Sequence, residues 1–282
     1  QALVRLVLEQ ARLDKAADRH TAGFVTGYRG SPVGGVDMQM TRAKALLDAH
    51  DIVFRPAVNE DLGATMVWGT QQIHRDSSKL FDGVFGLFYA KAPGIDRSGD
   101  PIRHANIYGT DPWGGVLAIG GDDPVAKSST IASQTDVSFA DLEMPVFSPM
   151  HVQDIIDMGL HGWAMSRFAG VCTAMTVTPE LMDGSGIYLP STQGFLIPET
   201  APGYSTHGGR FVPRLQDRVV VEQTLREIRL PAALSYIRHN QLNKKVLGPT
   251  QAKFGIITSG HGMGLIYDLF AELGIDEDIL QE

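Results

Sequence analysis

The sequence predicts an α/β fold, in which a doubly wound, mostly parallel sheet carries helices on both faces. Two observations lead to this prediction. Short apolar runs alternate with longer amphipathic runs, and the short runs are apolar almost throughout, as in strands that are buried on both faces. The predicted strands are Phe24–Tyr28, Ile52–Val58, Gly83–Ala90, Gly114–Ile119, Pro145–Pro149 and Val171–Val177.

The segments between these strands have the apolar spacing of amphipathic helices. Each of three segments places apolar or small residues on one stripe of a helix, which predicts the face that packs on the sheet. The stripes are Leu3, Leu6, Leu13 and Ala17 in the opening segment; Leu62, Met66 and Ile73 after the second strand; and Val152, Ile155, Ile156, Gly159 and Trp163 after the fifth.

We expect three parts along the chain: a main domain over residues 1–220, a linker or helical connection over 221–251, and the start of a second α/β domain over 252–282. Gly, Pro, Ser and Thr dominate from Thr178 to Arg218, which is typical of a packed excursion or a loop. Phe254–Gly260 is predicted as a strand and turn, followed by a helix through Leu273. One strand and one helix cannot form a core, and the chain opens with Gln1, so we expect it to be part of a longer protein.

Composition argues against several classes of protein. The net charge is −8, from 24 basic and 32 acidic residues, which disfavours nucleic-acid binding. No run approaches the roughly 18 to 20 apolar residues of a membrane-spanning helix, and we expect a cytoplasmic protein. The single cysteine, Cys172, cannot by itself form a disulfide framework or hold an iron–sulfur cluster. No histidine or cysteine spacing predicts a metal site.

Polar and glycine-rich segments follow or flank the predicted strands, and ligands bind at the carboxyl ends of such strands. Each segment alone could be an ordinary turn. Glu60 could be a helix-start charge, or a glutamate in an apolar cleft that exchanges a proton with a ligand nitrogen. The segments are Gly27–Pro32, Val58–Asp61, Tyr89–Arg97, Tyr108–Gly115 and Gly120–Pro124, the last extended by Lys127, Ser128 and Ser129.

Four of these strings carry a family resemblance: GYRGSP from Gly27, VNED from Val58, APGIDRSGDPIRHAN from Ala92 and GDDPVAKSST from Gly121. They resemble the thiamine-diphosphate-dependent 2-oxoacid:ferredoxin oxidoreductases. The longer strings most resemble the N-terminal, pyrimidine-binding domain of the fused bacterial indolepyruvate ferredoxin oxidoreductases. The resemblance covers essentially the whole chain and is most specific from Gly23 to Ala169.

The resemblance implies roles for individual residues. Glu60 matches the catalytic glutamate that contacts N1′ of the cofactor's aminopyrimidine ring and shares a proton with it. Asp122, Lys127, Ser128 and Ser129 match a loop near the cofactor cleft without individual roles, apart from Ser128, which is a candidate for substrate binding. The other implied residues are Gly30, Ser31, Pro32, Lys91, Pro93 and Gly94 for the cofactor, and Arg29 and Ser31 for the substrate.

The resemblance also implies an activity, namely oxidative decarboxylation of an aryl 2-oxoacid to acyl-coenzyme A with electrons passed to ferredoxin. The chain has no Gly-Asp-Gly segment, so Mg²⁺ and the diphosphate would be held by a region outside it, as would the iron–sulfur clusters. We therefore expect the isolated chain to be inactive. We also expect the full enzyme to be a homo-oligomer, as a homodimer, that uses coenzyme A.

Two other classes remain open from the residues alone. A Rossmann-type nucleotide-binding module would place an acid such as Glu60 at the end of the second strand, but Gly30, Gly34 and Gly35 lack the G-x-G-x-x-G spacing. A non-catalytic assembly domain would use the same loops for contacts between protomers.

Overall fold

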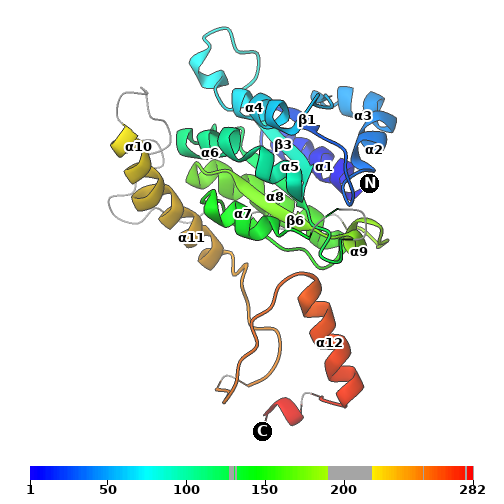
Figure 1. The fold of residues 1–282 in the computed structure, drawn as a ribbon. Helices are drawn as coiled ribbons and strands as arrows, with labels where there is room; N and C mark the ends of the chain where they lie inside the picture. Colours follow the sequence, from blue (N-terminus) through cyan, green and yellow to red (C-terminus); the bar gives the residue numbers. More distant parts are fainter. Residues whose placement is uncertain (127–129, 131, 190–217, 250, 277, 282) are drawn as a thin grey trace.

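A computed structural model of the chain describes residues 1–126, 130, 132–189, 218–249, 251–276 and 278–281. Its strands form one parallel sheet in the order β2-β1-β3-β4-β6-β5 (Figure 1). The doubly wound α/β prediction and its six strands are confirmed. The strands are β1 (Ala22–Gly27), β2 (Ile52–Phe54), β3 (Val84–Lys91), β4 (Val116–Gly121), β5 (Val146–Phe147) and β6 (Thr173–Val177).

Helices cover both faces of the sheet, and strand side chains alternate between two apolar clusters. In β3, Leu87 and Tyr89 face the first cluster while Phe88 and Ala90 face the second. The first face carries α1 (Ala2–Ala16), α2 (Val36–Arg42), α3 (Lys44–Asp48), α8 (Val152–Ala169) and α11 (Leu230–His239). The second face carries α4 (Glu60–Thr70), α5 (Ala92–Arg97), α6 (Gly99–Tyr108) and α7 (Thr135–Asp141).

The remaining elements are short or lie in the C-terminal part of the chain. They are η1 (Ile73–Arg75), α9 (Pro179–Met182), α10 (Arg218–Gln223), the π-helical turn η2 (Thr224–Arg229), α12 (His261–Leu273) and η3 (Ile279–Gln281). No helix in the described part of the chain is long and apolar enough to cross a membrane. The Gly/Pro/Ser-rich segment predicted from Thr178 lies largely outside the described residues.

The second strand is shorter than predicted. β2 ends at Phe54, where Ile52–Val58 was expected, because Pro56 has no amide hydrogen for a strand ladder. The chain nevertheless continues along β1: the amides of Arg55 and Ala57 donate to the carbonyls of Val25 and Gly27, both at 2.9 Å. This extension carries the chain to the start of α4.

The apolar stripe predicted for α4 was wrong. The residues of α4 that are buried are Gly63, Ala64 and Val67, whereas Leu62 is 50% exposed. The helix lies so close to β3 that a Cβ added to Gly63 would sit 3.1 Å from the Phe88 ring. Small residues therefore form the buried face. In α8 the predicted stripe is confirmed, with Ile155, Ile156, Gly159 and Trp163 buried.

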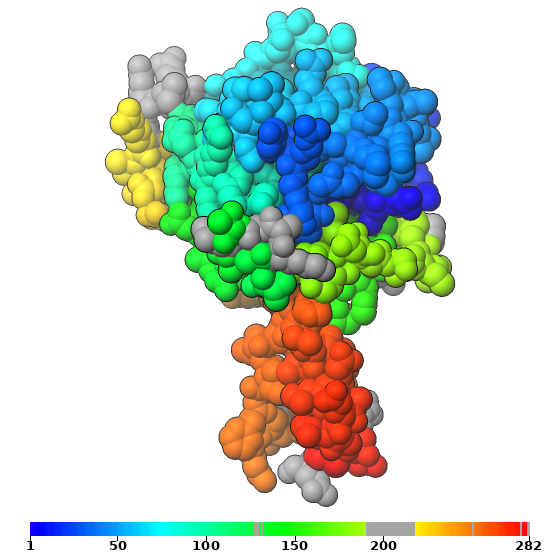
Figure 2. All heavy atoms as spheres, turned by 45° about the vertical axis from the view of Figure 1, so that its right-hand side comes forward, coloured from blue at the N-terminus to red at the C-terminus, as the bar shows by residue number. Residues whose placement is uncertain are grey.

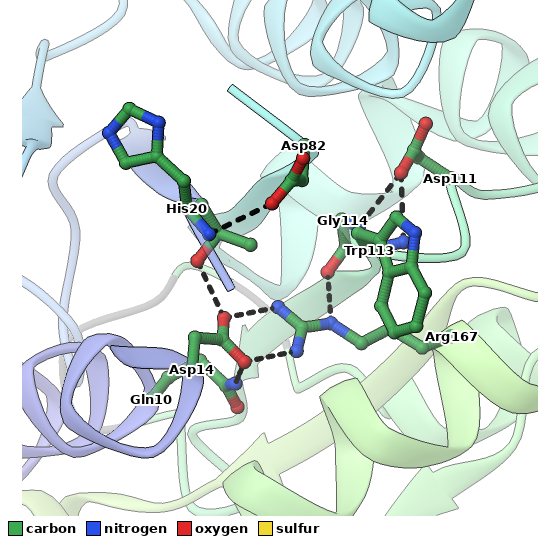
Figure 3. A network of polar contacts seen from close by, with 9 residues as sticks. Gln10, Asp14, His20, Asp82, Asp111, Trp113, Gly114 and Arg167 are labelled. Carbon is green, nitrogen blue, oxygen red and sulfur yellow. Dashed lines mark hydrogen bonds and ion pairs between the residues drawn. The ribbon is translucent and has the colours of Figure 1, made fainter. Parts of the chain in front are cut away.

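One buried ion pair joins the first and eighth helices to the start of β4 (Figure 3). Arg167 donates to both carboxylate oxygens of Asp14, at 2.6 and 2.7 Å, and its Nε donates to the Gly114 carbonyl at 2.8 Å. Gln10 and Thr21 donate to the same carboxylate. Every donor and acceptor near this pair is thus engaged, as a buried charge requires.

The helices after residue 218 belong to the packed body. Arg229, part of a basic stretch expected to lie in solvent, is 1% exposed. Its guanidinium donates to the carbonyls of Asn106, Ile107 and Gly170, at the carboxyl ends of α6 and α8. A cation is favoured there by the helix dipole. Leu225, Ala232, Ala233 and Tyr236 add apolar contacts to the first cluster.

The C-terminal segment projects away from the body (Figures 1 and 2). The strand predicted over Phe254–Gly260 is absent from this described segment, because no neighbouring strand is present to accept its hydrogen bonds. Phe254 and Ile257 are 91% and 101% exposed. The predicted helix is confirmed as α12, which has no buried residue. The three-part domain division remains a prediction.

We predict that Asp14→Asn destabilises the protein by about 3–5 kcal/mol, because the substitution leaves the Arg167 guanidinium buried without a carboxylate. Urea unfolding followed by circular dichroism measures this change.

The control is Asp48→Asn, which removes an exposed carboxylate that pairs with Lys44. We expect that variant to lose about 0.5 kcal/mol at most. Equal losses in the two variants would contradict a special role for the buried pair.

Candidate functional site

The topology places two loops side by side at the carboxyl edge of the sheet. The strand order turns between β1 and β3: β2 lies on one side of β1 and β3 on the other. In doubly wound sheets, ligands bind at this switch point. The segment after β1 and the segment after β3 meet here, since a Cβ on Gly30 would lie 2.6 Å from Cδ of Lys91.

Glu60 is the first residue of α4 and lies at the switch point. Asn59 caps this helix by accepting the Leu62 amide at 2.9 Å, so Glu60 is not needed as the cap. Glu60 is half-buried, and among the described residues no side chain or amide donates to its carboxylate. Its Oε1 would lie 2.7 Å from a Cβ added to Gly94. Glycine at position 94 therefore makes room for this carboxylate.

The β1 loop is held from two other directions. Pro32 packs on the end of β4, where a Cβ on Gly121 would lie 2.8 Å from its Cδ. The Tyr89 hydroxyl, at the buried end of β3, donates to Asp37 in the first turn of α2. The Tyr28 amide donates to the Tyr89 carbonyl at 3.0 Å. These contacts fix the loop between β1 and α2 against both neighbouring strands. Burial and the Asp37 carboxylate raise the pKa of Tyr89, which keeps its hydroxyl protonated.

The structure brings most of the predicted site residues together. Gly30, Pro32, Lys91 and Gly94 contact one another or Glu60 as described, and Lys91 is half-buried. Arg29, Ser31 and Pro93 are exposed at the same edge, where a ligand could reach them. Ser128, together with Lys127 and Ser129, lies outside the described residues.

Two expectations about these segments need correction. Lys91–Gly94 is not a loop: Lys91 ends β3, and Pro93 and Gly94 form the first turn of α5, where proline is favoured. The Tyr108–Gly115 segment lies at the opposite, amino edge of the sheet, because it enters β4. There the Asp111 side chain accepts the amides of Trp113 and Gly114, and the segment caps a strand entry.

Two further residues at this edge were not predicted from the sequence. Asp61, next to Glu60, accepts a hydrogen bond from Arg97 of α5 at 2.8 Å. Asp37 anchors the β1 loop through Tyr89. Their spacing in the sequence gives no signal, because both contacts link segments that are distant along the chain.

Asp122 follows β4 and is 7% exposed. Burial raises its pKa to about 6, although the Thr135 amide donates to both carboxylate oxygens, at 2.9 and 3.1 Å, and opposes the shift. Asp122 thereby holds the start of α7 near the carboxyl edge. Among the described residues, no group of three or more His, Cys, Asp or Glu side chains is placed to hold a metal ion.

Thiamine diphosphate, the cofactor implied by the resemblance, can be tested against these residues. An aminopyrimidine ring needs one carboxyl group for its N1′ and a flat, open surface beside it. Glu60 offers an unpaired carboxylate, and Gly94 leaves the space that any larger residue would fill. The residues present therefore fit the pyrimidine half of the cofactor.

We predict that Asp122→Asn changes how stability depends on pH. A raised pKa in the folded state means that the ionised carboxylate costs free energy, so wild-type stability falls as pH rises from about 4 to about 6 and stays lowered above. The amide can still accept from Thr135 without this cost. The variant should be more stable than wild type by about 1–3 kcal/mol at pH 7 and equal to it near pH 4.

Thermal unfolding across this pH range measures the effect, with Asp268→Asn on exposed α12 as the control. A difference that does not vary with pH would contradict the assignment.

The comparisons with known proteins agree with this geometry. No family model matches the chain. A curated relative, the indolepyruvate oxidoreductase subunit IorA of Methanothermobacter marburgensis, is 21% identical over 274 residues, which make up 95% of this chain and 40% of that protein.

A solved structure has a similar fold, with a TM-score of 0.59 and 17% identity over 95% of this chain and 50% of the other. It is 2-oxoglutarate:ferredoxin oxidoreductase from Magnetococcus marinus, with 2-oxoglutarate, coenzyme A and succinyl-CoA bound. This chain thus spans half or less of the length of both relatives. The predicted resemblance to the 2-oxoacid:ferredoxin oxidoreductases is confirmed: the chain is similar in sequence to one such subunit and in fold to another.

Proposed function

We propose that this chain supplies the pyrimidine-binding part of a thiamine-diphosphate-dependent 2-oxoacid:ferredoxin oxidoreductase. The observation that carries the proposal is the unpaired Glu60 carboxylate, half-buried at the sheet's switch point against Gly94. The relatives' names support this class of reaction. The IorA relative favours an aryl 2-oxoacid such as indolepyruvate as the substrate.

Each residue at the edge has a proposed task. Glu60 shares a proton with N1′ of the ring, and the low polarity around it strengthens that interaction. Gly94 and Lys91 form the wall beside the ring. Arg29 and Ser31, exposed on the β1 loop, bind the substrate's carboxylate through charge and a hydroxyl donor. When bound, thiamine diphosphate supplies the nucleophilic carbon and the electron sink for decarboxylation.

The rest of the activity would come from outside these residues. Mg²⁺ and the diphosphate, the iron–sulfur clusters and the coenzyme A site are assigned to other regions of the enzyme. Ferredoxin is the proposed electron acceptor, and homodimer assembly and a cytoplasmic location complete the proposal. The chain alone binds the cofactor weakly and turns nothing over.

We predict that Glu60→Gln slows hydrogen exchange at C2 of bound thiamine diphosphate about 10²–10⁴-fold in the complete enzyme, because an amide cannot take up the proton. Proton NMR after transfer to deuterated buffer measures the rate.

Glu227→Gln, which neutralises an exposed carboxylate on η2, is the control and should exchange at the wild-type rate. Unchanged exchange in Glu60→Gln would reject the proposed role, and titration with NAD would then test the nucleotide-binding alternative.

We further predict that Gly94→Ala weakens cofactor binding by at least about tenfold, or 1.4 kcal/mol, while the protein stays folded. The added methyl group would meet the Glu60 side chain, which is flexible and can turn away. Fluorescence titration with thiamine diphosphate measures affinity.

Gly69→Ala is the matched control, because a Cβ at Gly69 in α4 would contact nothing within 4 Å. Equal affinities in the two variants would show that Gly94 does not shape the site.

A further inference from the structure

An arginine lies close to Glu60 without pairing with it. Arg97 is three residues after Gly94 on α5, so the two share one face of that helix. Gly94 is the residue that contacts the Glu60 carboxylate. Arg97 therefore stands beside the same carboxylate, and its positive charge interacts with both Glu60 and Tyr28, which raises the pKa of Arg97 after the larger contribution of Asp61.

Asp61 takes the hydrogen bond that Glu60 could otherwise accept. The Nε of Arg97 donates to Oδ2 of Asp61 at 2.8 Å. Glu60 and Asp61 are neighbours at the start of α4, and both carboxylates are available to a cation from α5. A guanidinium bonded directly to Glu60 would occupy the oxygens needed for a ligand nitrogen and would hold the carboxylate in its ionised form.

We propose that Asp61 is a positioning residue, which holds the Arg97 guanidinium away from Glu60 and leaves the Glu60 carboxylate free for the aminopyrimidine ring. This inference rests on the proposed function for its purpose. The arrangement of the three side chains is a property of the chain itself and can be measured without cofactor.

The first test follows the Arg97 Nε–H proton by ¹⁵N NMR in the chain without cofactor. In Asp61→Ala, the guanidinium should move to Glu60, so its Nε–H stays protected from solvent exchange. In Asp61→Ala/Glu60→Ala both acceptors are gone, and protection should be lost. Loss of protection already in the single variant would overturn the proposal, because Arg97 would then have no second partner at Glu60.

The second test measures affinity for thiamine diphosphate in the complete enzyme. Asp61→Ala should weaken binding roughly tenfold. Adding Arg97→Gln should restore affinity to within about twofold of wild type, since the competing charge is removed. A purely structural role of Asp61 at the helix start would not be rescued in this way, so failure of rescue would overturn the proposal.

Asp141→Ala is the matched control, because Asp141 is the partner of another exposed arginine, Arg103, on α6. That variant should bind like wild type. The two proposals fail separately: wild-type C2 exchange in Glu60→Gln would reject the thiamine chemistry, whereas the NMR result decides the contact between Arg97 and its two acceptors whatever the cofactor is.

Discussion

Parallel pairing of β1 with β3 is the constraint on which the rest of the site depends. It puts the segment after β1 beside the segment after β3, while β2 on the far side of β1 delivers α4 to the same edge. Three stretches that are 30 or more residues apart along the chain thereby meet at one point. The polar groups there come from strand ends and helix starts, which a rigid sheet holds in place.

Close packing at this point explains why small residues recur. Gly94 admits the Glu60 carboxylate, and Gly121 admits Pro32. Larger side chains at either position would push the loops apart. The same economy of space appears along α4, where Gly63 and Ala64 let the helix rest on β3. The polar site and the apolar layer beneath it are thus shaped by one requirement, the near approach of α4 and the β1 loop to the central strands.

The sequence predicted the sheet well because its strands are continuous apolar runs bounded by turn residues, as Val171–Val177 shows. It also located Glu60, since an acid directly after a strand must reach the carboxyl edge. It misjudged the α4 face, because glycine and alanine carry little hydrophobic signal. The Asp61–Arg97 contact could not be predicted, since it depends on α5 beginning where a loop was expected. The Phe254–Gly260 strand failed because strand propensity needs a partner.

Arg229 has a practical consequence for how the molecule can be divided. Its guanidinium is enclosed by the terminal carbonyls of two helices that lie more than 50 residues earlier in the chain. A shorter version ending before α10 would uncover those carbonyls and the apolar patch on α8 that Tyr236 covers. The natural place to trim the polypeptide is after His239, where α11 ends and the exposed segment begins.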